Sequence, residues 1–234
     1  MRCLFLGDVM GRAGRAAVSE HLPRIRDEWR LDFVVVNGEN ASNGMGLSAD
    51  HARVLLAAGA DCITLGDHAF DQKDMLQFIE TEPRILRPLN FAKSAPGKGF
   101  RLFTARGGRK VLVLQVLGQV FMKRPFDDPF SAVEPVLKSH PLGGMASAVI
   151  VDMHCEATSE KMAMGHYCDG RASLVRIGRE PLRCGPVHDG SHGHRRPGTV
   201  DDGTAARAQA GRELRLLDAA PVFQQPLHDS DGRD

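Results

Sequence analysis

The sequence predicts an α/β domain in which helices cover a central sheet. Short apolar runs, typical of buried strands, alternate through about residue 155 with longer stretches whose apolar residues recur at helical spacing. This β-α-β-α-β order favours an α/β architecture. In addition, acids, amides and imidazoles follow the predicted strands, at the strand ends where such sheets bind ligands.

The expected elements follow in chain order. We expect strands at residues 3–6, 33–36, 61–65, 110–116 and 148–153. We expect helices at residues 15–29, 48–58, 72–80 and 131–139. Ser48 is the expected N-cap of the second helix, because a serine hydroxyl accepts hydrogen bonds from the unpaired amides of a first helical turn.

The composition changes after about Val175. Residues 176–234 contain nine arginines, no lysine and a single aromatic residue, Phe223, and hardly any strand-like run. Only residues 205–219 have a helical pattern. We therefore expect one domain over residues 1–175, followed by a divergent, poorly ordered tail over residues 176–234. An arginine-rich, lysine-free tail also suggests a change of reading frame near Val175, which resequencing would test.

Bulk composition narrows the function classes. A chain of 234 residues with 42% hydrophobic residues can bury one sizeable core. The net charge of +1 gives no basic field, so we expect no stable complex with nucleic acid. No apolar run approaches the ~20 residues of a membrane span or the length of a signal peptide. Five scattered cysteines without a secretory signal favour reduced thiols and a cytoplasmic location.

Candidate metal ligands and a candidate catalytic histidine, His68, lie at four strand ends. They are Asp8, Glu39, Asn40, Asp67, His68 and His154. Taken singly, an acid such as Asp8 is more often a turn or helix cap, and a lone histidine is more often structural. Carboxylates that converge on one pocket repel each other unless a cation neutralises them. Mixed oxygen and nitrogen ligands suit Mn, Fe or Zn better than Ca.

Six longer motifs resemble a known family. They are GDVxGxxGR at 7–15, NGENA at 37–41, GDHxFD at 66–71, DDPF at 127–130, DxHxEATSEK at 152–161 and DGRAS at 169–173. In this order they resemble the calcineurin-like metallophosphoesterase superfamily, and more narrowly its YmdB-like branch of bacterial phosphodiesterases. The resemblance covers about residues 1–175.

The resemblance implies a fold, a reaction and residue roles. The fold is a sandwich of sheets flanked by helices, here incomplete at the C-terminus. The reaction is hydrolysis of small phosphoesters such as 2′,3′-cyclic nucleotides by a hydroxide that bridges two divalent ions (Mn, Fe or similar). Asp8 would bind the first ion, Glu39 both ions, and Asp67 and His154 the second. The resemblance also implies that Asn40 lies beside the ions and that His68 is the catalytic proton donor or transition-state stabiliser.

Two departures from the family pattern affect this prediction. The family has Asn where this chain has Asp67, which predicts a changed metal preference. The family also carries Gly-Thr-His-Thr-His soon after residue 173, and here only His192 and His194 offer replacement ligands. The alternative function is therefore a catalytically impaired metal- or nucleotide-binding remnant. Because the family's later strands are missing, an exposed sheet edge predicts a homo-oligomer.

Overall fold

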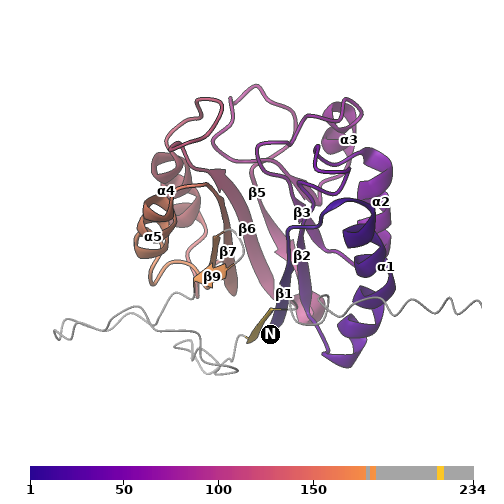
Figure 1. Cartoon of the computed structure of the whole chain (residues 1–234). Coiled ribbons are helices and arrows are strands. Elements are labelled where there is room, and N and C mark those ends of the chain that lie inside the picture. The colour runs from indigo at the N-terminus through magenta and orange to yellow at the C-terminus, as the bar shows by residue number, and fades with distance from the viewer. Residues whose placement is uncertain (178–179, 183–214, 219–234) are drawn as a thin grey trace, which may run out of the picture.

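The strands of the protein form two sheets that pack against each other, with helices on both outer faces (Figure 1). The computed structural model describes residues 1–177, 180–182 and 215–218. Helices α1, α2 and α3 cover the first sheet, and α4 and α5 cover the second (Figure 1). The predicted α/β sandwich flanked by helices is confirmed.

The first sheet is parallel throughout, in the strand order β10-β1-β2-β3-β4. Its strands are β1 (Arg2–Leu6), β2 (Phe33–Asn37), β3 (Cys62–Thr64), β4 (Ile85–Leu86) and β10 (Arg215–Asp218). Its helices are α1 (Gly11–Glu28), α2 (Ala49–Ala57) and α3 (Met75–Thr81). Parallel strands run in one direction, so the carboxyl ends of β1, β2 and β3 lie together, at the top of Figure 1.

The second sheet is mixed, in the strand order β5-β6-β7-β8-β9. Its strands are β5 (Phe100–Thr104), β6 (Lys110–Leu117), β7 (Ala148–His154), β8 (Leu174–Ile177) and β9 (Glu180–Leu182). Its helices are α4 (Pro129–Ser139) and α5 (Thr158–Tyr167), and a 3-10 turn, η1 (Arg106–Gly108), joins β5 to β6. Strands β6, β7 and β8 are parallel, whereas β5 and β9 pair antiparallel at the two edges.

Strand β2 explains why the expected strands read as unbroken apolar runs. All five of its residues are buried. Phe33 and Val35 belong to the apolar core between the sheets, and Val34 and Val36 belong to the core under the helices. Alternate side chains of a strand point to opposite faces, so a strand covered on both faces has no polar position along its middle.

The expected helices are confirmed, with shifted ends. The side chain of Ser48 accepts a hydrogen bond from the backbone N of His51 at 3.3 Å, as expected of an N-cap. Helix α1 begins at Gly11, four residues before the expected start, and α3 begins at Met75, three residues after it. Strands β4 and β5 and helix α5 were not predicted. The first two are short or half-exposed, and α5 has a weak apolar face.

The helix expected over residues 205–219 was wrong at the four residues of it that the structure describes. Strand β8 continues past Val175 to Ile177, β9 follows it, and residues 215–218 form β10 in place of the end of a helix. Strand β10 pairs in parallel with β1. Pairing with an open strand edge satisfies backbone hydrogen bonds in a way that local helix preference cannot reveal. The expected helical residues 205–214 lie outside the described part of the chain.

None of the helices in the described ranges combines the length and apolar character that crossing a membrane requires.

Candidate metal centre

The loops after β1 and β2 are tied to each other by backbone hydrogen bonds. The backbone N of Val9 donates to the Asn37 carbonyl at 3.0 Å, and that of Gly11 donates to the Asn40 carbonyl at 2.9 Å. These bonds bring Asp8 to Asn40, whose side-chain Nδ2 donates to Asp8 Oδ2 at 2.7 Å. Two of the predicted ligands therefore lie in contact.

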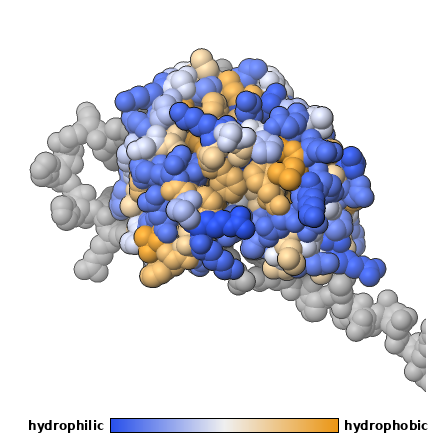
Figure 2. Space-filling model, turned by 90° about the horizontal axis from the view of Figure 1, so that it is seen from above, coloured by the Kyte–Doolittle hydropathy of each residue, from blue (hydrophilic) through white to orange (hydrophobic). Residues whose placement is uncertain are grey.

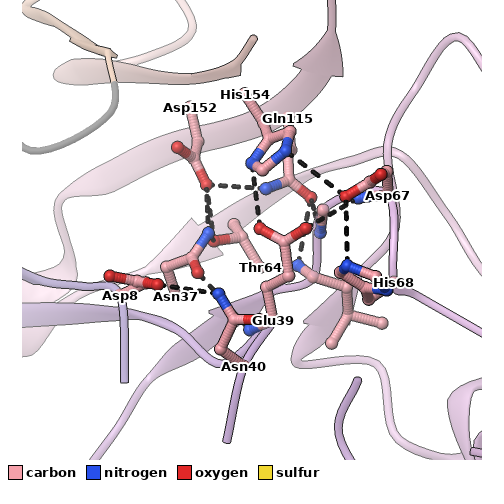
Figure 3. Close-up of polar contacts among 12 residues, drawn as sticks. Asp8, Asn37, Glu39, Asn40, Thr64, Asp67, His68, Gln115, Asp152 and His154 are labelled. Atoms are coloured by element: carbon pink, nitrogen blue, oxygen red, sulfur yellow. Dashed lines mark hydrogen bonds and ion pairs between the residues drawn. The ribbon is translucent and has the colours of Figure 1, made fainter. Parts of the chain in front are cut away.

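Three other predicted ligands form a tight cluster of one glutamate, one aspartate and one histidine (Figure 3). Glu39 follows β2, Asp67 follows β3, and His154 ends β7 of the other sheet. His154 Nδ1 lies 2.9 Å from Glu39 Oε2, and His154 Nε2 lies 3.4 Å from Asp67 Oδ1. One ligand atom from each residue lies within 4.8 Å of the other two. The cluster is thus built from both sheets.

A glycine makes room for the Glu39 carboxylate. Gly66 has φ +99°, and a Cβ on it would overlap the carboxyl group of Glu39. The backbone N of Asp67 donates to Glu39 Oε1 at 3.0 Å, which fixes the carboxylate against the chain. Glycine at this position is therefore a requirement of the site, because it permits both the backbone angle and the close approach.

The charges of Glu39, Asp67 and His154 offset one another. Burial raises the pKa of Glu39 above its usual range, although the nearby His154 opposes the shift. The hydrogen bond from His154 holds the pKa of Asp67 well below its usual range. Burial acts to lower the pKa of His154, but the bonds to Asp67 and Glu39 outweigh it and raise that pKa to about 10. An imidazolium thus balances two carboxylates.

This donor set fits a divalent cation. Ligand atoms bound to one ion at about 2.1 Å lie at most about 4.2 Å apart, so small side-chain adjustments bring the three groups into reach of one ion. Carboxylate oxygen and imidazole nitrogen suit Mn, Fe and Zn. A divalent ion would also replace the positive charge of the imidazolium and leave His154 neutral, the form in which histidine binds metals.

His68 lies beside the cluster and is held by a neighbouring acid. Its Nδ1 lies 2.6 Å from Asp71 Oδ2, and its Nε2 lies 3.9 Å from Asp67 Oδ1. Asp71 orients the ring through Nδ1, which leaves Nε2 on the side of the cluster. Figure 3 shows His68 and Asp67 on one side of Glu39, with Asp8 on the other. His192 and His194, the remaining predicted ligands, lie outside the described residues.

Sequence reasoning missed the buried polar residues behind the cluster. They are Asn37, Thr64, Gln115, Asp152 and Arg176. One signal could have revealed Gln115, since it is a polar residue within the otherwise apolar middle of β6. Asp152 gave a second signal, because it interrupts the apolar run of β7 two residues before His154.

Two sheets between helices, with acids and an imidazole gathered at the strand ends, are the arrangement expected from the resemblance to the calcineurin-like metallophosphoesterases. Within this class, a family model described as "YmdB-like protein" matches residues 4–178. The chain belongs to this family.

Relatives and solved structures agree with this assignment. A Bacillus subtilis (strain 168) protein named 2′,3′-cyclic-nucleotide 2′-phosphodiesterase is 40% identical over 175 residues, which cover 75% of this chain and 65% of the relative. A hypothetical protein from Thermus thermophilus is 42% identical, with a TM-score of 0.70 over 92% of this chain and 75% of that one. A Mycoplasma pneumoniae structure described as a novel phosphatase has a TM-score of 0.67 and 27% identity over 92% of this chain and 70% of that one. The chain thus spans slightly less than two thirds of the Bacillus relative.

Proposed function

We propose that the protein is a metal-dependent phosphodiesterase that hydrolyses small phosphoesters such as 2′,3′-cyclic nucleotides, with two divalent ions such as Mn or Fe. The observation that carries this proposal is the cluster of Glu39, Asp67 and His154. The name of the Bacillus relative supports both the reaction and the substrate class.

The proposed roles follow from where each side chain lies. Divalent ions supply Lewis acidity and lower the pKa of bound water, which phosphodiester hydrolysis needs at neutral pH. Glu39, Asp67 and His154 would hold one ion. Asp8 and Asn40, in contact at 2.7 Å, are the other predicted ligands in the described part of the chain. In the tail, His192 and His194 are proposed to complete the set.

His68 is the proposed proton donor. A leaving 2′-oxygen needs a proton as its bond to phosphorus breaks. Asp71 Oδ2, 2.6 Å from Nδ1, orients the ring so that Nε2 faces the cluster, the position from which it would donate. The Asp71 carboxylate therefore acts as the orienting partner of the imidazole.

Apolar surface near the strand ends suits a nucleoside. Figure 2 looks onto the face formed by the strand ends and shows hydrophobic residues in its middle, enclosed by hydrophilic ones. Met10, Met45 and Phe121 are large exposed apolar residues on the loops that follow β1, β2 and β6. A base can pack on such side chains while its phosphoester reaches the polar cluster.

Location and assembly remain predictions. None of the cysteines in the described ranges forms a disulfide, which supports the proposed cytoplasmic location. The expected homo-oligomer would be tested by the mass of the purified protein in solution.

The test is Mn²⁺-dependent hydrolysis of 2′,3′-cyclic AMP by the full chain, beside direct measurement of Mn²⁺ binding. Glu39→Gln should lower both binding and turnover, the latter by at least about a hundredfold, because the site loses a buried anionic ligand. Glu20→Gln, the same change at an exposed position on α1, is the matched control and should behave as wild type. Mn²⁺ binding without hydrolysis would replace the proposal with the metal-binding remnant, and absence of both would refute it.

A further inference from the structure

We propose that Gln115 and Asp152 are positioning residues, which set the geometry of the three clustered ligands from inside the sandwich. This inference rests on the proposed function, because it concerns the metal ligands named there. Neither side chain belongs to the cluster itself. Both are fully buried, Gln115 on β6 and Asp152 on β7.

Asp152 collects hydrogen bonds from both sheets. Its Oδ2 accepts from Thr64 Oγ1 at 2.7 Å and from Asn37 Nδ2 at 3.2 Å, both on the first sheet. The same oxygen accepts from Gln115 Nε2 at 2.7 Å, on the second sheet. Arg176 Nη1 lies 3.4 Å from Oδ1 and balances the charge. A buried carboxylate is tolerated only with such compensation, so these partners fix its position.

Gln115 connects Asp152 to the backbone that precedes Asp67. Its Oε1 accepts from the backbone N of Leu65 at 3.0 Å and from that of Gly66 at 3.2 Å. These two amides directly precede Asp67, and Gly66 is also the residue against which the Glu39 carboxylate lies. Because the amide nitrogen of Gln115 is held by Asp152, its oxygen cannot follow a movement of the loop. The turn after β3 is therefore anchored to the second sheet.

Asn37 makes the corresponding connection to Glu39. Its Nδ2 donates to Asp152, and its Oδ1 accepts from the backbone N of Glu39 at 3.4 Å. His154 is attached more directly, since it lies two residues after Asp152 on the same strand. Each of the three ligands thus connects to one carboxylate by a short chain of buried contacts (Figure 3).

A metal site requires that the spacing between the two sheets be fixed. The ligands come from different sheets, and metal binding demands their placement within about 0.2 Å. Backbone pairing fixes registers within a sheet but does not fix the spacing between sheets. The bonds from Asp152 to Asn37 and Thr64 cross that space. Supporting groups of this kind typically change metal affinity by about ten- to a hundredfold when removed.

The test compares Mn²⁺ affinities of the full chain, measured from the electron paramagnetic resonance of free Mn²⁺, and the visible spectrum of the Co²⁺ form. Gln115→Met keeps the size of the side chain and removes both polar ends. Thr64→Val removes one donor to Asp152 without changing shape. Val133→Ala, on the buried face of α4 that packs against the second sheet, is a control for loss of stability alone. Unfolding of every variant is measured in EDTA.

The expected result is Mn²⁺ binding about ten- to a hundredfold weaker in Gln115→Met, with an altered Co²⁺ spectrum, while Val133→Ala binds as wild type does. Thr64→Val should show a smaller loss of the same kind, and it decides the question if Gln115→Met does not fold. Affinities and spectra in both polar variants equal to those of Val133→Ala would overturn the inference. If the wild type binds Mn²⁺ without hydrolysing 2′,3′-cyclic AMP, the proposed function fails and the affinities still decide this inference. If the wild type binds no Mn²⁺, both fall.

Discussion

Gly66→Ala should remove metal binding while the fold survives. A Cβ at position 66 would lie 2.0 Å from Glu39 Cδ and 2.1 Å from Oε2. Ordinary contact begins at 3.4 Å, so the carboxylate has to move by about 1.4 Å. That shift is several times the roughly 0.2 Å tolerance of metal coordination. Glu39 is buried, so its carboxylate would have to move among packed neighbours.

The cost to folding is smaller than the cost to the site. An alanine at positive φ is strained by about 1–2 kcal/mol, against a total stability on the order of 5–15 kcal/mol. A misplacement of more than about 1 Å in a catalytic group can lower turnover about a hundredfold. We therefore expect a folded protein with a lowered unfolding midpoint, at least about a hundredfold less active, and without measurable Mn²⁺ affinity.

Gly107→Ala is the matched control for this prediction. Gly107 has φ +76°, and a Cβ there meets nothing within 4 Å. Both variants place an alanine at positive φ, and only Gly66→Ala brings a Cβ against Glu39. Calorimetric Mn²⁺ titration and thermal unfolding of both proteins make the comparison. Mn²⁺ affinity in Gly66→Ala equal to that in Gly107→Ala would refute the reasoning.

Two further predictions concern stability and thiol chemistry. Arg30 follows the C-cap of α1 and has φ +52°, a backbone conformation that glycine adopts without strain. Arg30→Gly should therefore raise the free energy of unfolding by about 0.5–1 kcal/mol, the relieved strain less the added chain entropy. Urea titration checks this, and no gain in stability would contradict it. Burial raises the pKa of Cys3 and of Cys155 to about 12, which lowers the thiolate fraction at pH 8 about a thousandfold. Iodoacetamide at pH 8 should therefore modify both thiols about a thousandfold more slowly in the native than in the unfolded protein, as site-resolved mass spectrometry would show. Fast labelling of the native protein would contradict the burial argument. Both thiols ionise near pH 9 in the unfolded chain, so the same pKa shift should make the free energy of unfolding fall as the pH rises from 9 towards 12.

The sequence predicted the strands that carry the site because their signal is local. Residues 33–36 are apolar without a break, and the polar residues that follow them can only lie at a strand end. Ser48 is a similar case, since an N-cap depends on a few neighbouring atoms. Strand β10 could not be predicted in this way, because its pairing partner, β1, lies about 200 residues earlier in the chain.

The candidate site shows the same division between local and distant information. Strand ends indicated Glu39, Asp67 and His154 as neighbours, and the structure brings these three together. The pairing of each acid with a histidine depends on how the two sheets pack, and the spacing of residues in the sequence does not encode that pairing. The contact between Asp71 and His68 is local and follows the motif. The contacts of Asp152 with Asn37 and Thr64 span 115 and 88 residues, so only the folded chain reveals them.

The origin of the ligands in two different sheets gives an ion at this position a second effect. Glu39 and Asp67 belong to one half of the sandwich and His154 to the other, so an ion bound to all three joins the halves. The binding free energy of the ion then adds to the cohesion between the layers, and thermodynamic linkage requires that each tenfold rise in free ion above its Kd adds about 1.4 kcal/mol to the stability of the whole domain. Scarcity of the ion would therefore loosen the layers as well as stop turnover, and the amount of intact protein would follow the supply of metal.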